Sequence, residues 1–227
     1  MLLPSVSVVM PVGAGDRFFR LALDCFRYQT YEGPLEIVIL DNSVEPIEHL
    51  LPCDPHIKYA RSDRLTIGAL RNRGNSLATG DVIVHFDEDD WYSDDRIAAQ
   101  VERLQVTGKA ATGWHSLLFF DTSDGRCYRY VYAGAGPYGT GTSLCYTRAW
   151  WAKHSFNAAI KKGEDYWFQL DAAQAGQLDS TDARQLCVMR AHMDSTCPPT
   201  FCSSQFPTVA PEALPDEFWR AVAPAAP

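Results

Sequence analysis

Residues 81–90 read Asp-Val-Ile-Val-His-Phe-Asp-Glu-Asp-Asp, and this stretch decides how the fold is interpreted. The apolar, β-branched run within 81–86 predicts a buried strand. Four consecutive carboxylates follow where that strand ends, and their mutual repulsion costs stability unless a cation or hydrogen-bond donors neutralise them. Oxygen ligands of this kind suit Mg²⁺ or Mn²⁺. The alternative is a solvated acidic turn before a helix that is capped by Ser93 or Asp94.

The rest of the first half alternates strands with helices around this stretch. Strands are expected at 6–10, 35–40, 56–60 and 81–86, and helices at 16–26, 66–79 and 94–106. This alternation predicts an α/β domain with a mostly parallel central sheet and helices on both faces. Ligands in such sheets bind beyond the carboxyl ends of the strands, so we expect Asp41 and residues 87–90 to meet at one rim.

The second half has a different pattern. A β-hairpin is expected from 117–120 and 127–132, and a flexible or close-packing glycine-rich loop at 134–141. A helix at 164–175 and a last strand at 185–191 follow. From Cys197 onward the chain is rich in Pro, Ala and Ser, so residues 197–227 are expected to form a loosely attached tail or a lid.

Composition excludes several classes of protein. The chain has 227 residues with 20 Lys and Arg against 28 Asp and Glu, and the net charge of −8 does not favour general attraction to nucleic acid or anionic lipid. No run of 18 apolar residues predicts a transmembrane helix, and the N-terminus lacks the features of a signal peptide. Seven cysteines without a Cys-x-x-Cys pair indicate a reducing, cytoplasmic setting in which most thiols pack in the core.

Several polar residues could carry chemistry, and each has a structural alternative. Asp41 could cap a turn or accept a hydrogen bond from a base or ribose. Glu164 and Asp165 could stabilise a helix N-terminus, or one could act as a general base. His192 could be structural or could complete the coordination of Mn²⁺. Four tryptophans are candidates either for core packing or for a sugar platform: Trp114, Trp150, Trp151 and Trp167.

Together these segments resemble a family 2 glycosyltransferase with the GT-A fold. The similarity covers residues 5–196. The matching segments are the opening strand 6–11, Tyr-Gln-Thr-Tyr at 28–31, Leu-Arg-Asn-Arg-Gly at 70–74 with Ala-Thr-Gly-Asp at 78–81, the D-x-D segment at 86–92, and Gly-Glu-Asp at 163–165. His192 stands where many members carry a histidine before Asn-Thr-Ser, although Asp-Ser-Thr follows nearby here at 194–196.

The resemblance implies an α/β, Rossmann-like GT-A domain over residues 1–196. Its nucleotide-sugar half would be 5–106 and its acceptor half, with the hairpin and loops, 107–196. On the donor side, the resemblance implies that Pro11 and Asp41 line the pocket of the nucleotide base, that Arg71 or Asn72 lies near this base or the ribose, and that Asp87 or Glu88 faces the ribose. Asp87 and Asp89 would form the D-x-D, with Asp89 the direct metal ligand and His192 a further metal or diphosphate contact. Asp165 would be the catalytic base, and Glu164 would support it or bind the acceptor.

The implied activity is metal-dependent, inverting transfer of a sugar from a nucleotide-sugar to an acceptor hydroxyl. Mn²⁺ or Mg²⁺ is the implied cofactor, and a UDP-sugar is the default donor. The acceptor stays open among a glycan, a lipid-linked sugar, a small molecule and a modified nucleic acid. Two alternatives also stay open: a non-catalytic module that binds a nucleotide-sugar or glycan, and a sugar-1-phosphate nucleotidyltransferase. The latter usually has basic residues after the first strand, where only Arg17 and Arg20 occur.

Overall fold

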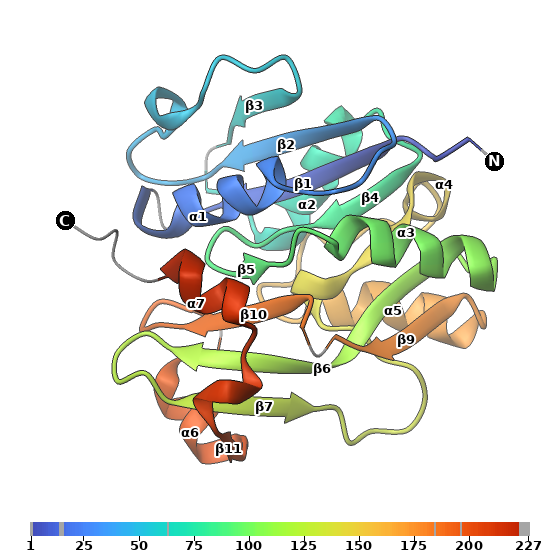
Figure 1. Ribbon diagram of the computed structural model, residues 1–227. Coiled ribbons are helices and arrows are strands. Elements are labelled where there is room, and N and C mark those ends of the chain that lie inside the picture. The colour runs from blue at the N-terminus through green and yellow to red at the C-terminus, as the bar shows by residue number, and fades with distance from the viewer. Residues whose placement is uncertain (1, 14–15, 63, 184, 196, 223–227) are drawn as a thin grey trace.

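The computed structural model describes residues 2–13, 16–62, 64–183, 185–195 and 197–222. One twisted sheet runs through the molecule with helices on both faces (Figure 1). Its strands are β1 (Val6–Val12), β2 (Leu35–Asp41), β3 (Ile57–Arg61), β4 (Val82–His85), β5 (Trp91–Tyr92), β6 (Ala111–Asp121), β7 (Cys127–Val131), β8 (Cys145–Thr147), β9 (Leu178–Asp182), β10 (Cys187–Ala191) and β11 (Thr208–Val209). The helices are α1 (Asp16–Arg27), α2 (Ile67–Leu77), α3 (Arg96–Thr107), α4 (Arg148–Trp151), α5 (Glu164–Gln174), α6 (Pro199–Gln205) and α7 (Asp216–Val222), with 3₁₀ turns η1 (Glu48–Leu50), η2 (Gly141–Ser143) and η3 (Pro211–Ala213).

The first four long strands form the parallel half of the sheet, in the spatial order β3-β2-β1-β4. Val8 pairs with Ile37 on one side and Val84 on the other, and all three side chains are buried. Continuous apolar runs are expected for strands covered on both faces. The predicted parallel arrangement is therefore confirmed, and it brings the ends of β1, β2 and β4 to one edge.

Antiparallel strands extend this sheet in the second half of the chain. β8 pairs antiparallel with β4 and with β6, and β6 forms the predicted hairpin with β7. β9 and β10 lie parallel to β6, and the short β5 pairs with β10. Because β8 connects β4 to β6, the two halves of the chain share one sheet. Strand β9 was not predicted, since its Leu-Asp-Ser-Thr-Asp sequence lacks an apolar run.

Helix α2 lies directly against the parallel strands. Thr66 caps it by accepting a hydrogen bond from the backbone N–H of Ala69 at 3.3 Å. A Cβ atom at Gly74 would lie 2.5 Å from Val9 Cγ1 and 2.8 Å from Leu40 Cδ2. Glycine at this position therefore permits the close approach of α2 to the sheet, which in turn fixes the side chains that α2 directs toward the strand ends.

Helix α3 begins later than the sequence predicts. Its N-cap is Asp95, which makes no side-chain capping bond, so neither Ser93 nor Asp94 is the cap. The two-residue strand β5, which was not predicted, lies between the carboxylate cluster and the helix, so the helix starts later in the chain. The predicted end is confirmed, because Gly108 adopts a left-handed conformation with φ of 65°.

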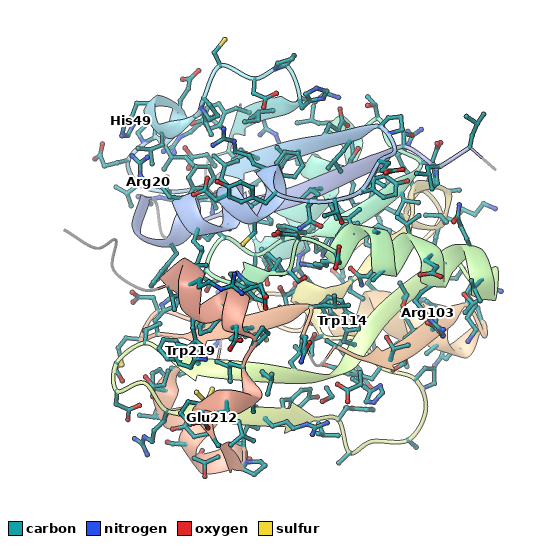
Figure 2. All side chains as sticks on the ribbon, in the orientation of Figure 1. Arg20, His49, Arg103, Trp114, Glu212 and Trp219 are labelled. Atoms are coloured by element: carbon teal, nitrogen blue, oxygen red, sulfur yellow. The ribbon has the colours of Figure 1, made fainter. Side chains whose placement is uncertain are left out.

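The segment from residue 197 to 222 is not a loosely attached tail, so this expectation was wrong. Cys202, Leu214 and Phe218 are buried in the same core as the first strands, and β11 pairs with β7. Trp219, labelled on α7 in Figure 2, contacts Phe120 with ring centroids 5.4 Å apart. A few apolar residues, spaced along the segment, attach it to the core. The high Pro and Ala content of the segment predicted a tail and gave no sign of these contacts.

The cysteines follow the predicted pattern. All seven are free, and five of them are buried: Cys25, Cys127, Cys145, Cys187 and Cys202. Among the described residues, no helix has the length and apolar character needed to cross a membrane.

Candidate functional site

A cleft of about 840 Å³ opens at the carboxyl ends of the parallel strands. It is lined by the end of β1, the acidic cluster, the start of α5, the β6–β7 hairpin and α6. The lining residues are 11–13, 42, 64–67, 70–71, 87–89, 119, 130, 138, 140–142, 161–165, 189, 194–195, 197, 201 and 206. The cleft therefore lies where ligands bind in open α/β sheets.

Arg71 joins the two sides of this cleft. Its guanidinium is buried, with Nη1 2.5 Å from Glu164 Oε1 and Nη2 3.2 Å from Asp87 Oδ1. Burial raises the pKa of both carboxyls, and the Arg71 charge opposes that rise. Arg71 thus connects the end of β4 to the start of α5 and holds two negative side chains in place.

Asp89 and His192 meet on the other side of the acidic cluster. His192 Nε2 lies 2.9 Å from Asp89 Oδ2, and the imidazole packs on Phe18 with ring centroids 4.4 Å apart. Among the described residues, no group of three or more His, Cys, Asp or Glu side chains is arranged to hold a metal by itself. The Asp89 carboxylate nevertheless fits Mn²⁺ or Mg²⁺ and the imidazole fits Mn²⁺, and both ions commonly take further ligands from phosphates and water.

The other two carboxylates of the cluster, Glu88 and Asp90, accept hydrogen bonds from backbone or hydroxyl groups of the protein. Glu88 Oε1 accepts a hydrogen bond from the backbone N–H of Gly13 at 2.6 Å, which connects the cluster to the end of β1. Asp90 is buried and accepts hydrogen bonds from the Thr142 hydroxyl at 2.9 Å and the backbone N–H of Arg190 at 3.1 Å. Burial, aided by the neighbouring carboxylates, raises the pKa of Asp90 well above its usual value. Different donors thus separate the four acidic side chains and limit their repulsion.

Asp41 is the last residue of β2, at the strand end where it was predicted, but it does not line the cleft. Its carboxylate is fully buried and accepts hydrogen bonds from the N–H groups of Ser43 and Ile47, the Tyr59 hydroxyl and the Arg61 guanidinium. Burial alone would raise the pKa of Asp41, but these donors outweigh it and lower the pKa to about 2. Asp41 therefore organises the turn after β2.

Asn42, the next residue, lines the cleft in place of Asp41. Its Oδ1 accepts a hydrogen bond from the backbone N–H of Leu65 at 3.0 Å. This bond connects the turn after β2 to the loop before α2. The turn motif Asp-Asn-Ser at 41–43 indicated this position in the sequence, but the prediction named Asp41 and not Asn42.

Asn72 also lies outside the cleft, in contrast to Arg71. Its Oδ1 accepts hydrogen bonds from the Trp151 indole N–H at 2.9 Å and the Phe156 backbone N–H at 3.0 Å. Its Nδ2 donates to the Phe156 carbonyl at 2.7 Å. Asn72 therefore attaches α2 to the segment before α5, and of the two residues named for the base or ribose only Arg71 reaches the cleft.

Glu164 and Asp165 begin α5, directly after Gly163, which has φ of 79°. Both line the cleft, with Glu164 buried on Arg71 and Asp165 more open. A Cβ at Gly141 would lie 2.8 Å from Asp165 Oδ2. The glycine-rich loop therefore packs closely beside the Asp165 carboxylate, which agrees with the close-packing alternative for this loop.

The tryptophans are not part of the cleft lining. Trp114 (Figure 2) is buried, with the Arg96 guanidinium 5.1 Å from its ring centroid. None of Trp114, Trp150, Trp151 and Trp167 is among the described residues that line the cleft. Apolar lining residues near the strand ends are Pro11, Val12, Leu65, Ile67 and Leu70. Others come from β6, β7, β10 and α6, and sequence analysis missed these because they lie far apart along the chain.

Basic residues on the rim were also missed. Arg64, Lys161 and Lys162 line the cleft and are exposed. Arg64 is the described non-glycine residue with a positive φ, at 46°. These charges line the same cleft as the acidic cluster and would attract an anionic ligand such as a diphosphate. The Lys-Lys-Gly sequence at 161–163 offered a signal for two of them.

Comparison with known proteins identifies the family. Residues 7–162 match the model of glycosyl transferase family 2, which is more than half of the chain, so the chain belongs to this family. EpsH of Bacillus subtilis (strain 168) is 31% identical over 97 residues, which cover 40% of this chain and 28% of EpsH. Glycosyltransferase GlyA of Streptococcus pneumoniae is 26% identical over 131 residues, 56% of this chain and 18% of GlyA. The chain thus spans less than a third of either relative.

Solved structures with a similar fold confirm the GT-A prediction. The mannosyltransferase PcManGT from Pyrobaculum calidifontis, in complex with GDP-Man and Mn²⁺, has a TM-score of 0.67 at 17% identity, covering 85% of this chain and 58% of PcManGT. S. aureus TarS 1-349 in complex with UDP-GlcNAc has a TM-score of 0.66 at 13% identity, covering 96% of this chain and 64% of TarS 1-349. At these identities the similarity shows the fold alone.

Proposed function

We propose that this protein is a metal-dependent, inverting glycosyltransferase that moves a sugar from a nucleotide-sugar to an acceptor hydroxyl. One observation carries the proposal. Asp89, which contacts the buried His192, and Asp165 line one cleft, in which Arg71 joins Asp87 to Glu164. A carboxylate backed by an imidazole and a second, accessible carboxylate in the same cleft suit displacement of a nucleoside diphosphate.

The donor side of the proposed site includes Pro11, Asn42 and Asp87. Asp89 and His192 would hold Mn²⁺ or Mg²⁺, with the donor diphosphate and water completing the coordination. When bound, the ion supplies neutralisation of the charge that develops on the leaving diphosphate. Arg71 supports this side by holding Asp87 at 3.2 Å, and the exposed Lys161 and Lys162 contribute positive charge.

The acceptor side of the proposed site contains the catalytic base. Asp165 would accept the proton of the acceptor hydroxyl while that oxygen attacks the anomeric carbon from the face opposite the leaving group. The C–O bond to the diphosphate breaks as the new glycosidic bond forms, so one displacement inverts the carbon. Glu164 is engaged with Arg71, which leaves the base role to Asp165.

The donor is proposed to be a UDP-sugar. A structural neighbour, TarS, is described with UDP-GlcNAc and another, PcManGT, with GDP-Man and Mn²⁺, so the choice of base needs a direct measurement. The free thiols agree with the reducing, cytoplasmic setting that we propose.

Calorimetric titration tests the donor site. UDP, GDP, CDP and their common sugar conjugates are titrated into the protein with and without Mn²⁺. We expect one nucleotide to bind only when the metal is present, and we expect Asp89→Ala to abolish this metal-dependent binding. Asp24→Ala, an exposed carboxylate on α1 outside the cleft lining, is the matched control. Absence of metal-dependent binding for every nucleotide would contradict the proposal.

The two other functional classes give different results in the same assay series. A sugar-1-phosphate nucleotidyltransferase would release pyrophosphate from a nucleoside triphosphate. A non-catalytic module would bind a nucleotide-sugar but release no nucleoside diphosphate in the presence of any acceptor. An accessible Asp165 beside the glycine-rich loop favours transfer over simple binding, because binding alone does not need a base at that position.

A further inference from the structure

Part of the cleft lining is apolar. We call this surface the apolar wall and define it as Phe119, Tyr130, Met189, Phe201 and Phe206, all of which line the cleft. They come from β6, β7, β10, α6 and the residue after α6. The wall thus joins the hairpin to the C-terminal segment.

The rings of the wall pack against one another. Phe206 is the centre, with ring centroids 5.2 Å from Phe119, 5.3 Å from Tyr130 and 5.6 Å from Phe201. The planes are tilted or perpendicular, at 41°, 60° and 88°. This arrangement forms a contoured apolar surface instead of one flat platform. Phe201 keeps 44% of its surface exposed, so the wall is accessible from the cleft.

Asp165 and the five residues of the wall line one cleft, together with Cys197. The Asp165 charge also adds to the burial that raises the pKa of the Tyr130 hydroxyl and of the Cys197 thiol, which agrees with this placement. A molecule whose hydroxyl is next to Asp165 can therefore reach the wall within the cleft.

The chemistry of the wall selects against a chain of sugars. Tyr130 carries the one hydroxyl of the wall, and the other four side chains have no hydrogen-bonding group except the weak thioether acceptor of Met189. A pyranose ring carries hydroxyls on most of its carbons, and covering them without partners costs free energy. An apolar ring or chain instead gains about 25 cal/mol for each Å² that it buries.

We propose that the apolar wall is the acceptor subsite and that it takes an acceptor whose reactive hydroxyl is attached to an apolar, ring-bearing body, as in an aryl glycoside, and not a stretch of polysaccharide. This proposal rests on the glycosyl transfer proposed above. The reactive hydroxyl lies at Asp165, and the apolar body lies over Phe201 and Phe206.

Cysteine alkylation provides a test that needs no knowledge of the donor. Cys197 lines the cleft, whereas Cys53 is exposed and is not among its lining residues. The protein is treated with iodoacetamide at mildly alkaline pH, and alkylation of both residues is followed by mass spectrometry. The probes are phenyl β-D-glucoside, methyl β-D-glucoside and maltotetraose. Cys53 is the internal control for reagent and probe effects.

Phenyl glucoside should slow alkylation of Cys197 at about tenfold lower concentration than methyl glucoside, since only the phenyl ring buries additional apolar surface. Maltotetraose should not protect Cys197, and no probe should protect Cys53. Phe201→Ala should remove the preference for the phenyl compound. Tyr28→Ala, which removes an exposed aromatic side chain outside the cleft lining, should retain it.

Equal protection by phenyl and methyl glucoside, or stronger protection by maltotetraose, would overturn the acceptor assignment. So would an unchanged phenyl preference in Phe201→Ala. These outcomes are separate from failure of the proposed function, which appears as absence of metal-dependent nucleotide binding in the calorimetric titration. Phenyl-specific protection without nucleotide binding would retain the apolar subsite and reject glycosyl transfer.

Discussion

At the scale of single residues, neighbouring positions in the chain serve different purposes. Asp41 is buried within its own turn, whereas Asn42 reaches the cleft. Arg71 bridges Asp87 and Glu164, whereas Asn72 attaches α2 to a distant segment. Sequence motifs pointed to chain segments that reach the cleft, but a motif does not specify which of two adjacent side chains lines it.

Asp165→Asn should abolish sugar transfer and leave nucleotide binding nearly unchanged. The amide cannot accept the acceptor proton, and general-base catalysis typically contributes about 10²–10⁴-fold to a rate. Turnover is followed by nucleoside diphosphate release, and binding by calorimetry. Asp171→Asn, an exposed position on the same helix outside the cleft lining, is the matched control. Normal turnover by Asp165→Asn would exclude Asp165 as the base.

Arg71→Met should weaken the coupling between the two sides of the cleft. It removes the cation that Asp87 and Glu164 share and leaves the buried Glu164 and the partly buried Asp87 without it, which costs about 3–5 kcal/mol. Arg71→Lys keeps the charge but cannot bridge both carboxylates in the same way, so it should rescue stability more than kcat. Thermal unfolding and turnover of both variants separate these effects. Equal rescue of stability and kcat by lysine would contradict a bridging role.

Asp41 should contribute stability that is lost in acid. Its pKa of about 2 in the folded protein is below the ordinary value of 3.8, so its contribution is fully present above the unfolded pKa and disappears as the pH falls through about 2. A shift of this size corresponds to about 2 kcal/mol. Asp41→Asn should lose about that much at pH 7, as measured by urea unfolding, and should flatten the decline between about pH 4 and pH 2. The exposed Asp24→Asn should match the wild type in both respects.

At the scale of helices and strands, the first half of the chain was predictable and much of the second half was not. Apolar runs identified β1, β2 and β4, and glycine marked the end of α3. The polar β9 and the two-residue strands β5 and β11 depend on pairing with distant strands, so local sequence gives little sign of them. The acidic cluster after β4 was recognised because it follows an apolar run, whereas the apolar wall is assembled from residues 119, 130, 189, 201 and 206 and was missed.

Gly74→Ala should destabilise the contact between α2 and the sheet. The added methyl would lie 2.5 Å from Val9 Cγ1 and 2.8 Å from Leu40 Cδ2, so the helix or the strands must move. Overpacking of this kind costs about 1–3 kcal/mol, more than alanine gains in helix propensity. Ser76→Ala, on the exposed side of the same helix, should be neutral or slightly stabilising. A Gly74→Ala protein as stable as Ser76→Ala in urea unfolding would refute the close approach.

At the scale of the whole molecule, the C-terminal segment is part of the same core as the first strands. Phe218 on α7 is fully buried and contacts Trp91, with ring centroids 5.9 Å apart, and Phe120 at 5.3 Å. Sheet, hairpin and C-terminal helices therefore share one hydrophobic interior. The segment also supplies Phe201 and Phe206 to the cleft, so its folding and the shape of the proposed acceptor subsite are coupled.

Phe218→Ala should therefore destabilise the entire protein and not only its C-terminal segment. Removing a buried phenylalanine typically costs about 3–5 kcal/mol. Because α7 packs on residues of both β5 and β6, the loss should lower the midpoint of a single unfolding transition seen equally by tryptophan fluorescence and circular dichroism. Phe201→Ala, which removes the same side chain from a position that is 44% exposed, should cost much less while altering the cleft. A separate early transition in Phe218→Ala, with the main midpoint unchanged, would instead mean that residues 197–222 fold as an independent attachment.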